Sequence, residues 1–404
     1  MQRLKRRPRL ATQLAAAVLK IRAIYVSTYI PRECGIATYT KDLTNAINIL
    51  NPLFLADIIA IDDQASGGER RRYPWEVKYK IEQENLRSWI NAADYINQSG
   101  ADVVALEHEF GIYGGHLGEY AVPFAEAIRK PLVTTFHTVL SNPNAKQREM
   151  VKRLATRSEA IIIMVNAGLE KLVELYGVDR NKIVVIPHGV PDITFGPTKW
   201  AKTRLDLGSD NIIAGFGLLS PGKGYEYAIG AMPTILKQHP HTKMLILGET
   251  HPVVLRKFGD DYRASLKRLV KRLGLEKAVQ FVNKYLSLEE IVEYLKATDV
   301  YITPFLDLNQ ITSGTLSYAI GAGKACVSTP YLYAQDVLSD NRGLLVAPQD
   351  SDDLAAKIIH LLDHPRLRQQ IARNAYQFGR NMIWPNVALR HLDLFEIVAE
   401  RYRR

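Results

Sequence analysis

Residues 211–224 read Asn-Ile-Ile-Ala-Gly-Phe-Gly-Leu-Leu-Ser-Pro-Gly-Lys-Gly, an apolar run followed by a glycine-rich loop. A helical pattern begins near Tyr225, so Gly217 and Lys223 lie in a strand-to-helix loop. Open α/β sheets bind anions in such loops, at the carboxyl ends of their strands. We therefore expect an α/β domain in which Lys223 brings a point charge to a phosphate.

A second loop follows the predicted strand at 300–303, and residues 310–330 read Gln-Ile-Thr-Ser-Gly-Thr-Leu-Ser-Tyr-Ala-Ile-Gly-Ala-Gly-Lys-Ala-Cys-Val-Ser-Thr-Pro. Four small residues should begin a helix there: Thr312, Ser313, Gly314 and Thr315. The first N–H groups of a helix have no partner inside it, so they are free to face a phosphate. Since both loops belong to one domain and one sheet edge, we expect them to form a diphosphate cradle. The alternative is two ordinary loops with a solvated lysine.

Apolar runs alternate with helical patterns along the whole chain, which is typical of parallel α/β sheets. The chain has 404 residues, more than the roughly 250–300 at which one core usually divides. Strands are predicted at 21–28, 54–61, 101–106, 131–136, 160–165 and 182–186, and in the second half at 212–216, 242–247, 279–282, 300–303, 325–328 and 343–346.

The predicted fold class is therefore α/β, with two Rossmann-like doubly wound domains. The expected parts are a basic extension at 1–20, domains at 21–192 and 193–374, and terminal helices at 375–404. The proline- and glycine-rich stretch 191–199 is the expected linker. Residues 64–72 should be an exposed loop, and 287–290 form a capping box that should begin a helix.

The composition, 47% hydrophobic and 23% charged, is ordinary for a globular protein. Only two cysteines occur, Cys34 and Cys326, which excludes a disulfide framework and a zinc cluster. A reducing compartment, the cytoplasm, is the natural expectation. The acidic pairs at 260–261 and 350–353 are typical of a surface loop and a helix start, so no metal site is expected.

The formal charge is 52 minus 42, or +10, and five basic residues lie in 1–9. The apolar stretch that follows them is too short to span a bilayer. Three interpretations of this segment stay open: a dispensable extension, a peripheral contact with anionic lipid at the inner face of the membrane, and a targeting peptide. Nucleic acid is not an expected partner, because the basic residues are not interleaved with aromatic ones.

A series of motifs points to a known family: Pro31-Arg32-Glu33-Cys34-Gly35, Phe136-His137-Thr138, Val185-Ile186-Pro187-His188-Gly189-Val190, Lys223-Gly224, Leu247-Gly248-Glu249, Ala297-Thr298-Asp299-Val300 and Gly321-Ala322-Gly323. With them, residues from about 22 to 400 resemble a family 4 (group 1) glycosyltransferase of the GT-B fold. The resemblance implies two domains facing a cleft, the first for the acceptor and the second for the donor. It also implies a C-terminal helix that crosses back to the first domain.

The resemblance implies roles for individual residues. His137 would lie by the donor sugar, where an imidazole can hydrogen-bond a hydroxyl, and we group it with Lys223 and Gln310 as catalytic. The predicted donor-binding residues are Gly35, Gly217, Lys223, Gly248, Thr312, Ser313, Gly314, Thr315 and Tyr318. Gly35 is included because a side chain there would obstruct a close approach. His188 is expected to shape the cleft and not to react.

Three positions depart from the family pattern. Leu218 stands where members commonly carry an arginine, and Gln310 and Tyr318 stand where they carry two glutamates, the second on the ribose. Gln310 can still bond hydroxyls through its amide, and Tyr318 can stack on or bond to the nucleoside. Arg256 and Arg263 are the candidates to replace the missing arginine.

The acceptor site is predicted on a strand-terminal segment with many donors and acceptors: Glu107, His108, Glu109 and Tyr113. The alternative is a loop whose charges are simply solvated.

Three functions fit these observations. The leading one is a retaining, metal-independent hexosyltransferase that uses a nucleoside diphosphate sugar, with a glycan, lipid or small molecule as acceptor and no cofactor. The second is a disaccharide phosphorylase that uses inorganic phosphate, and the third is a non-catalytic sugar or nucleotide binder. Nucleotide binding separates the first from the second, and turnover separates both from the third.

Overall fold

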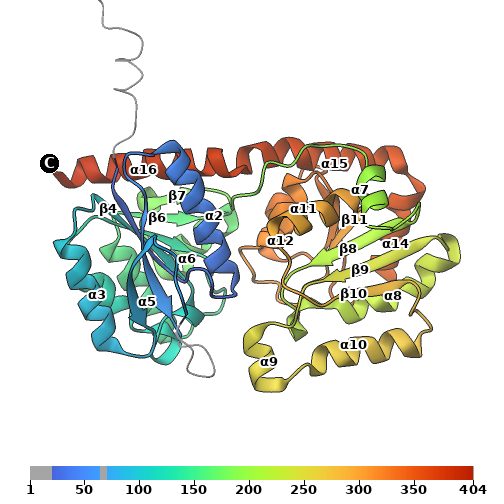
Figure 1. Ribbon diagram of the computed structural model, residues 1–404, viewed down its shortest axis with the longest axis horizontal. Coiled ribbons are helices and arrows are strands. Elements are labelled where there is room, and N and C mark those ends of the chain that lie inside the picture. The colour runs from blue at the N-terminus through green and yellow to red at the C-terminus, as the bar shows by residue number, and fades with distance from the viewer. Residues whose placement is uncertain (1–20, 64–70, 404) are drawn as a thin grey trace, which may run out of the picture.

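The computed structural model describes residues 21–63 and 71–403. Figure 1 shows two α/β domains side by side, joined by a connecting segment and by helical segments along one side of both. The predicted extension at 1–20 and most of the predicted loop at 64–72 lie outside the described residues. In the described part, no helix is both long and apolar enough to cross a bilayer.

The first domain is built on a parallel sheet of seven described strands in the order β3-β2-β1-β4-β5-β6-β7. The strands are β1 Ala23–Ser27, β2 Asp57–Asp62, β3 Val77–Glu82, β4 Val103–His108, β5 Leu132–Phe136, β6 Ala160–Ile163 and β7 Ile183–Val185. The helices between them are α2 Gly35–Leu50, α3 Leu86–Gln98, α4 Ala121–Ala127, α5 Ala145–Arg157 and α6 Asn166–Tyr176. All six predicted strands are confirmed, and β3 is an addition at the edge of the sheet.

The second domain repeats this plan with six described strands in the order β10-β9-β8-β11-β12-β13, again all parallel. The strands are β8 Asn211–Phe216, β9 Thr242–Leu247, β10 Val279–Val282, β11 Val300–Thr303, β12 Ala325–Ser328 and β13 Gly343–Leu345. The helices are α7 Lys199–Arg204, α8 Tyr225–Gln238, α9 Pro252–Phe258, α10 Asp261–Arg272, α11 Leu288–Ala297, α12 Gly314–Gly321, α13 Leu332–Val337, α14 Ser351–Asp363 and α15 Pro365–Gly379. Each predicted strand is present.

The predicted capping box begins α11 as expected. The Ser287 hydroxyl accepts a hydrogen bond from the Glu290 N–H at 3.3 Å, and the Ser287 N–H donates to the Glu290 carboxylate at 3.0 Å. The pair satisfies N–H groups that a helix start would otherwise leave without a partner.

The chain crosses back to the first domain at residues 380–383. Helix α15 still packs on α12 and β12 of the second domain, whereas α16, Trp384–Arg403, packs on α2 and β4 of the first. The crossing therefore comes a few residues later than the predicted boundary at 375. Here the outgoing and returning segments are joined, since Val190 N–H donates to Met382 O at 2.8 Å and Trp384 N–H donates to Val190 O at 3.0 Å.

Candidate functional site

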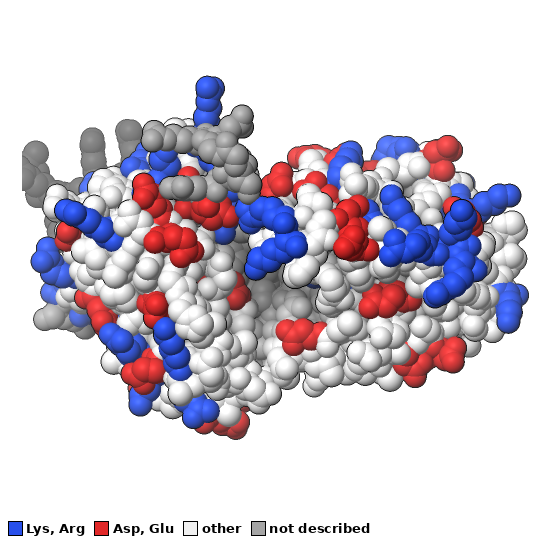
Figure 2. Space-filling view, turned by 90° about the horizontal axis from the view of Figure 1, so that it is seen from below, with Lys and Arg blue, Asp and Glu red and all other residues white. Residues whose placement is uncertain are grey.

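The loops that carry the predicted residues follow the carboxyl ends of strands in both sheets. They come after β1, β4 and β5 in the first domain and after β8, β9 and β11 in the second. Figure 2 shows a recess between the two domains with Lys and Arg side chains beside it. His188 of the first domain reaches the second, because its Nε2 lies 3.1 Å from where a Cβ on Gly314 would lie. The topology thus gathers loops of both domains at one place.

Two glycine turns bring three loops of the second domain into contact. Gly217 has φ +130° and Gly248 has φ +123°, which L side chains rarely adopt. A Cβ on Gly248 would lie 2.3 Å from the Gly217 carbonyl oxygen, and a Cβ on Gly217 would lie 3.1 Å from Cγ2 of Thr315. The loops after β8 and β9 and the start of α12 are therefore in contact. The predicted diphosphate cradle requires such a contact between the loop after β8 and the start of α12.

Lys223 is half-buried in the loop after β8. Its Nζ lies 3.9 Å from the centroid of the Phe305 ring, in cation–π contact. Burial lowers the pKa of Lys223 to about 8, so the ammonium remains largely charged at neutral pH. Gly224 fixes the loop, since a Cβ there would lie 2.0 Å from the Pro304 carbonyl oxygen.

The start of α12 is well defined. The Ser313 hydroxyl caps the helix by accepting from the Leu316 N–H at 3.3 Å. The N–H groups of Gly314 and Thr315 belong to the first turn, where the helix has no carbonyl to receive them. Gln310 donates from Nε2 to the Thr312 carbonyl at 2.5 Å, so its amide holds the loop before the helix.

His137 is held by a buried carboxylate. Its Nε2 lies 2.8 Å from Oε2 of Glu107, and Glu107 is fully buried. The ring of Tyr39 stands edge-on to His137 at 5.0 Å and to His188 at 5.1 Å between centroids. Glu107 thereby fixes the direction of the imidazole at the carboxyl end of the sheet.

The predicted acceptor residues divide into buried and accessible ones. Glu107, His108 and Tyr113 are 0%, 0% and 2% exposed, and the Tyr113 hydroxyl donates to the Glu107 carbonyl at 3.0 Å. Within the described residues neither ring nitrogen of His108 has a hydrogen-bond partner, and burial lowers its pKa to about 3. These three side chains support the loop from within. Glu109 alone of the four is partly exposed, and its carboxylate accepts from the Thr138 hydroxyl, so its role towards an acceptor stays a prediction.

The two arginines proposed to replace the missing one lie in different places. Arg263 is fully buried and donates to the Gly248 carbonyl at 2.8 Å, so it supports the glycine turn from behind. Arg256 is exposed on α9. Burial is the main cause of the lowered pKa of His251, to which the charges of Lys223 and Arg256 add. Burial raises the pKa of Asp63, but the charges of Arg32, Arg71 and, least, Arg256 lower it. Arg256 is therefore the better placed of the two to act on a ligand.

Two contacts between the domains were missed from the sequence. Tyr318 donates from its hydroxyl to Oδ2 of Asp42 at 2.9 Å, and the hydroxyls of Thr38 and Tyr285 lie 3.0 Å apart. The available signal was the four-residue spacing of Thr38 and Asp42, which places both on one face of α2. Gly35 begins the same helix, and a Cβ there would meet nothing within 4 Å.

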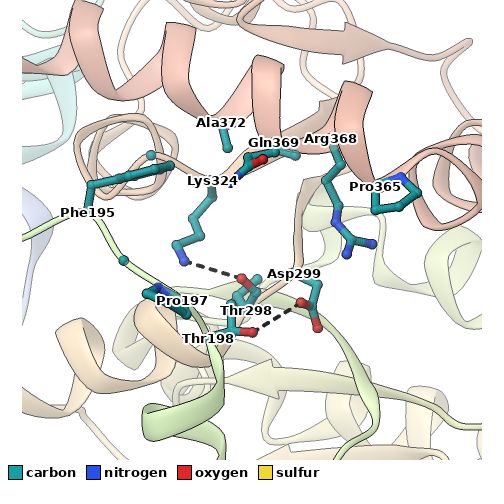
Figure 3. A pocket seen from close by; sticks show the side chains of 13 residues that line it. Phe195, Pro197, Thr198, Thr298, Asp299, Lys324, Pro365, Arg368, Gln369 and Ala372 are labelled. Atoms are coloured by element: carbon teal, nitrogen blue, oxygen red, sulfur yellow. Dashed lines mark hydrogen bonds between the residues drawn. The ribbon is translucent and has the colours of Figure 1, made fainter.

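A cavity of about 470 Å³ lies elsewhere, at the amino ends of β11 and β12 (Figure 3). Lys324 in its wall donates to the carbonyls of Thr298 at 3.3 Å and Lys296 at 3.4 Å, at the carboxyl end of α11. Asp299 pairs with Lys202 at 2.5 Å. These charges are engaged in holding the fold, and the cavity is at the opposite end of the sheet from the loops above. Among the described residues no three His, Cys, Asp or Glu side chains gather as metal ligands would, and the absence of a metal site stays a prediction.

Two doubly wound parallel domains with their loops facing a shared recess define the GT-B class of fold. Residues 35–192 match the family model for Glycosyltransferase Family 4, and residues 199–378 match that for Glycosyl transferases group 1. The chain belongs to the family 4, group 1 glycosyltransferases.

Relatives and solved structures agree with this placement. The chain is 29% identical over 304 residues to a D-inositol 3-phosphate glycosyltransferase of Acidothermus cellulolyticus, covering 67% of this chain and 63% of that one. It is 26% identical over 267 residues to a mannosylfructose-phosphate synthase of Agrobacterium fabrum, covering 63% and 56%. The chain thus spans less than two thirds of the length of these relatives.

Two solved structures share the fold across almost the whole chain. One is a sucrose-phosphate synthase from Thermosynechococcus elongatus, with TM-score 0.76, 16% identity and coverage of 95% of this chain and 100% of that one. The other is Anabaena Alr3699/HepE in complex with UDP and glucose, with TM-score 0.73, 17% identity and coverage of 93% and 99%. At these identities the likeness concerns the fold.

Proposed function

We propose that this protein is a retaining hexosyltransferase that moves a sugar from a nucleoside diphosphate to a saccharide, lipid or small-molecule acceptor. The observation that carries the proposal is the contact of three loops at Gly217, Gly248 and Thr315, the first of which also carries Lys223. It supports a diphosphate cradle made of an ammonium group and free helix N–H groups.

In the proposed reaction, the bond between the anomeric carbon and the diphosphate oxygen breaks. The anomeric carbon then bonds the acceptor oxygen on the same face of the sugar, and the proton of the acceptor hydroxyl goes to the departing diphosphate. Negative charge grows on the leaving group, and Lys223 and the N–H groups of Gly314 and Thr315 would stabilise it. Because these groups supply the positive field, the proposed reaction needs no metal ion.

His137 would orient the donor sugar. A histidine held by Glu107 at 2.8 Å presents its ring in one direction, and an imidazole can hydrogen-bond a sugar hydroxyl. Two relatives, a D-inositol 3-phosphate glycosyltransferase and a mannosylfructose-phosphate synthase, are named for small polyols or sugars, which supports an acceptor of that kind.

A phosphorylase remains the second candidate, because Gln310 and Tyr318 replace the two carboxylates expected at a nucleotide sugar. Such an enzyme would place inorganic phosphate beside Lys223 and would have no ribose to bind.

A thermal-shift panel with UDP, GDP, ADP and inorganic phosphate, followed by transfer assays with the matching nucleotide sugars, tests the proposal. We expect one nucleoside diphosphate to stabilise the protein and Lys223→Ala to abolish that shift without lowering the Tm of the free protein. Stabilisation by phosphate alone would favour the phosphorylase. No response to any of the four would contradict both reactions.

A further inference from the structure

The contact between Tyr318 and Asp42 joins the predicted donor helix to the other domain. Tyr318 is 7% exposed on α12, one turn after the cap that presents Gly314 and Thr315. Its hydroxyl donates to Oδ2 of Asp42, on α2 of the first domain, at 2.9 Å. A carboxylate of the first domain is thereby bonded to the helix whose start forms part of the predicted phosphate site.

Asp42 is held by its neighbours but not enclosed by them. Its side chain is partly exposed, and its helix makes a second contact one turn earlier, between the hydroxyls of Thr38 and Tyr285 at 3.0 Å. Burial raises the pKa of Asp42, and the hydrogen bond from Tyr318 and the charge of Lys41 oppose that rise. The pair therefore presents an oriented carboxylate at the recess.

The position suits one part of a nucleoside diphosphate. Tyr318 lies one helical turn, about 5.4 Å along the axis, after the start of α12. A group next to Tyr318 is therefore about that far along the helix from a phosphate bound at its start. In a nucleoside diphosphate the group next to the phosphates is the ribose, whose 2′ and 3′ hydroxyls can both donate hydrogen bonds. A carboxylate has two oxygens to accept both, whereas a phenol accepts through a single oxygen.

We propose that Asp42, oriented by Tyr318, recognises the ribose of the donor nucleotide. The inference rests on the proposed transferase function and extends it: the second domain binds the diphosphate, and the first domain binds the ribose. Donor binding then draws the two domains together, because one ligand bridges them. Asp42 is a specificity-determining residue in this scheme, and Tyr318 is a positioning residue.

Isothermal titration of UDP against its 2′-deoxy and 3′-deoxy forms tests the inference, with the GDP or ADP series used if the thermal panel selects that base. For the unaltered protein we expect the deoxy forms to bind about 10-fold to 100-fold more weakly, as the loss of a hydrogen bond to a charged group predicts. Asp42→Asn should weaken the ribonucleotide by a similar factor and remove the difference between the forms. Tyr318→Phe should keep part of that difference, because the carboxylate remains but is less well held.

Asp94→Asn, an exposed position on α3, is the matched control and should leave all affinities unchanged. Equal binding of UDP and its deoxy forms by the unaltered protein would overturn the inference. So would unchanged binding by Asp42→Asn. Tighter binding would also overturn it, and would identify the Tyr318–Asp42 contact as one that the nucleotide must break. Absence of any nucleoside diphosphate binding would instead overturn the proposed function itself.

Discussion

Lys223 combines a half-buried position with a charge that the proposed reaction requires. Because burial lowers its pKa to about 8, the charge is present below that pH and is lost as the pH rises through it. We expect kcat/KM for the donor to fall about tenfold per pH unit above about pH 8, since a neutral amine no longer attracts the diphosphate. A profile of kcat/KM between pH 6 and 10 measures this.

Lys223→Arg is the control for the pH profile. A guanidinium stays charged throughout the range, so the decline above pH 8 should disappear even if the overall rate is lower. The same decline in both proteins would assign the titration to another group.

Variants of the His137–Glu107 pair can distinguish an effect on stability from an effect on the transfer reaction. His137→Ala removes the partner of a carboxylate that is fully buried, and we expect a loss of about 3–5 kcal/mol in stability along with the transfer activity. Adding Glu107→Gln to that variant removes the buried charge and should recover part of the stability, but not the activity. Denaturant unfolding and transfer rates of the three proteins measure both effects. Full recovery of transfer in the double variant would show that His137 is only a packing residue.

Local sequence patterns predicted the structure around some candidate residues and not around others. Lys223 and the small residues before α12 were predictable, because glycine turns and helix starts are determined by near neighbours. The place of Asp42 was not, because its bond to Tyr318 joins positions 276 residues apart in the chain. The burial of His108 could not be predicted either, since the sequence does not show whether a histidine at the end of a strand turns its ring inward or outward.

At the scale of elements, the interior strands could be predicted from the sequence, but the edge strand β3 could not. Strands buried on both faces are continuous apolar runs, which is how β1, β4 and β8 were recognised. Strand β3 alternates charged and uncharged residues, and Ile81 is its only fully buried member among the described residues. Without an apolar run, an edge strand of this kind resembles a polar loop.

The junction at Val190 offers a prediction about the crossing between domains. A Cβ on Gly189 would lie 2.0 Å from Cε3 of Trp384, so Gly189→Ala must displace the first residue of α16. We expect a cost of about 1–3 kcal/mol, seen as a lower Tm, with a reduced transfer rate because the two domains meet at a changed angle. Gly196→Ala is the control, since a Cβ there meets nothing within 4 Å. Equal Tm values for the two variants would show that Trp384 moves aside freely.

At the scale of the whole molecule, the C-terminal helix makes the first domain depend on the last residues of the chain. Phe395 of α16 is fully buried, and its ring meets that of Tyr25 on β1 at 6.1 Å between centroids. The alternation of strands and helices predicted two domains, but only the resemblance to a family indicated the return of this helix. The first domain is therefore completed by a segment that follows the second.

Substitutions on α16 test this dependence. Phe395→Ala leaves a cavity in the first domain, at a cost of about 3–5 kcal/mol, and should lower the temperature at which that domain unfolds. Leu389→Ala on the same helix is the control, since Leu389 is 46% exposed and a surface change usually costs less than about 0.5 kcal/mol. Calorimetry of the two variants and of the unaltered protein measures these unfolding temperatures. If the Phe395→Ala and Leu389→Ala variants unfold at the same temperature, α16 adds little stability to the first domain and only connects the two domains.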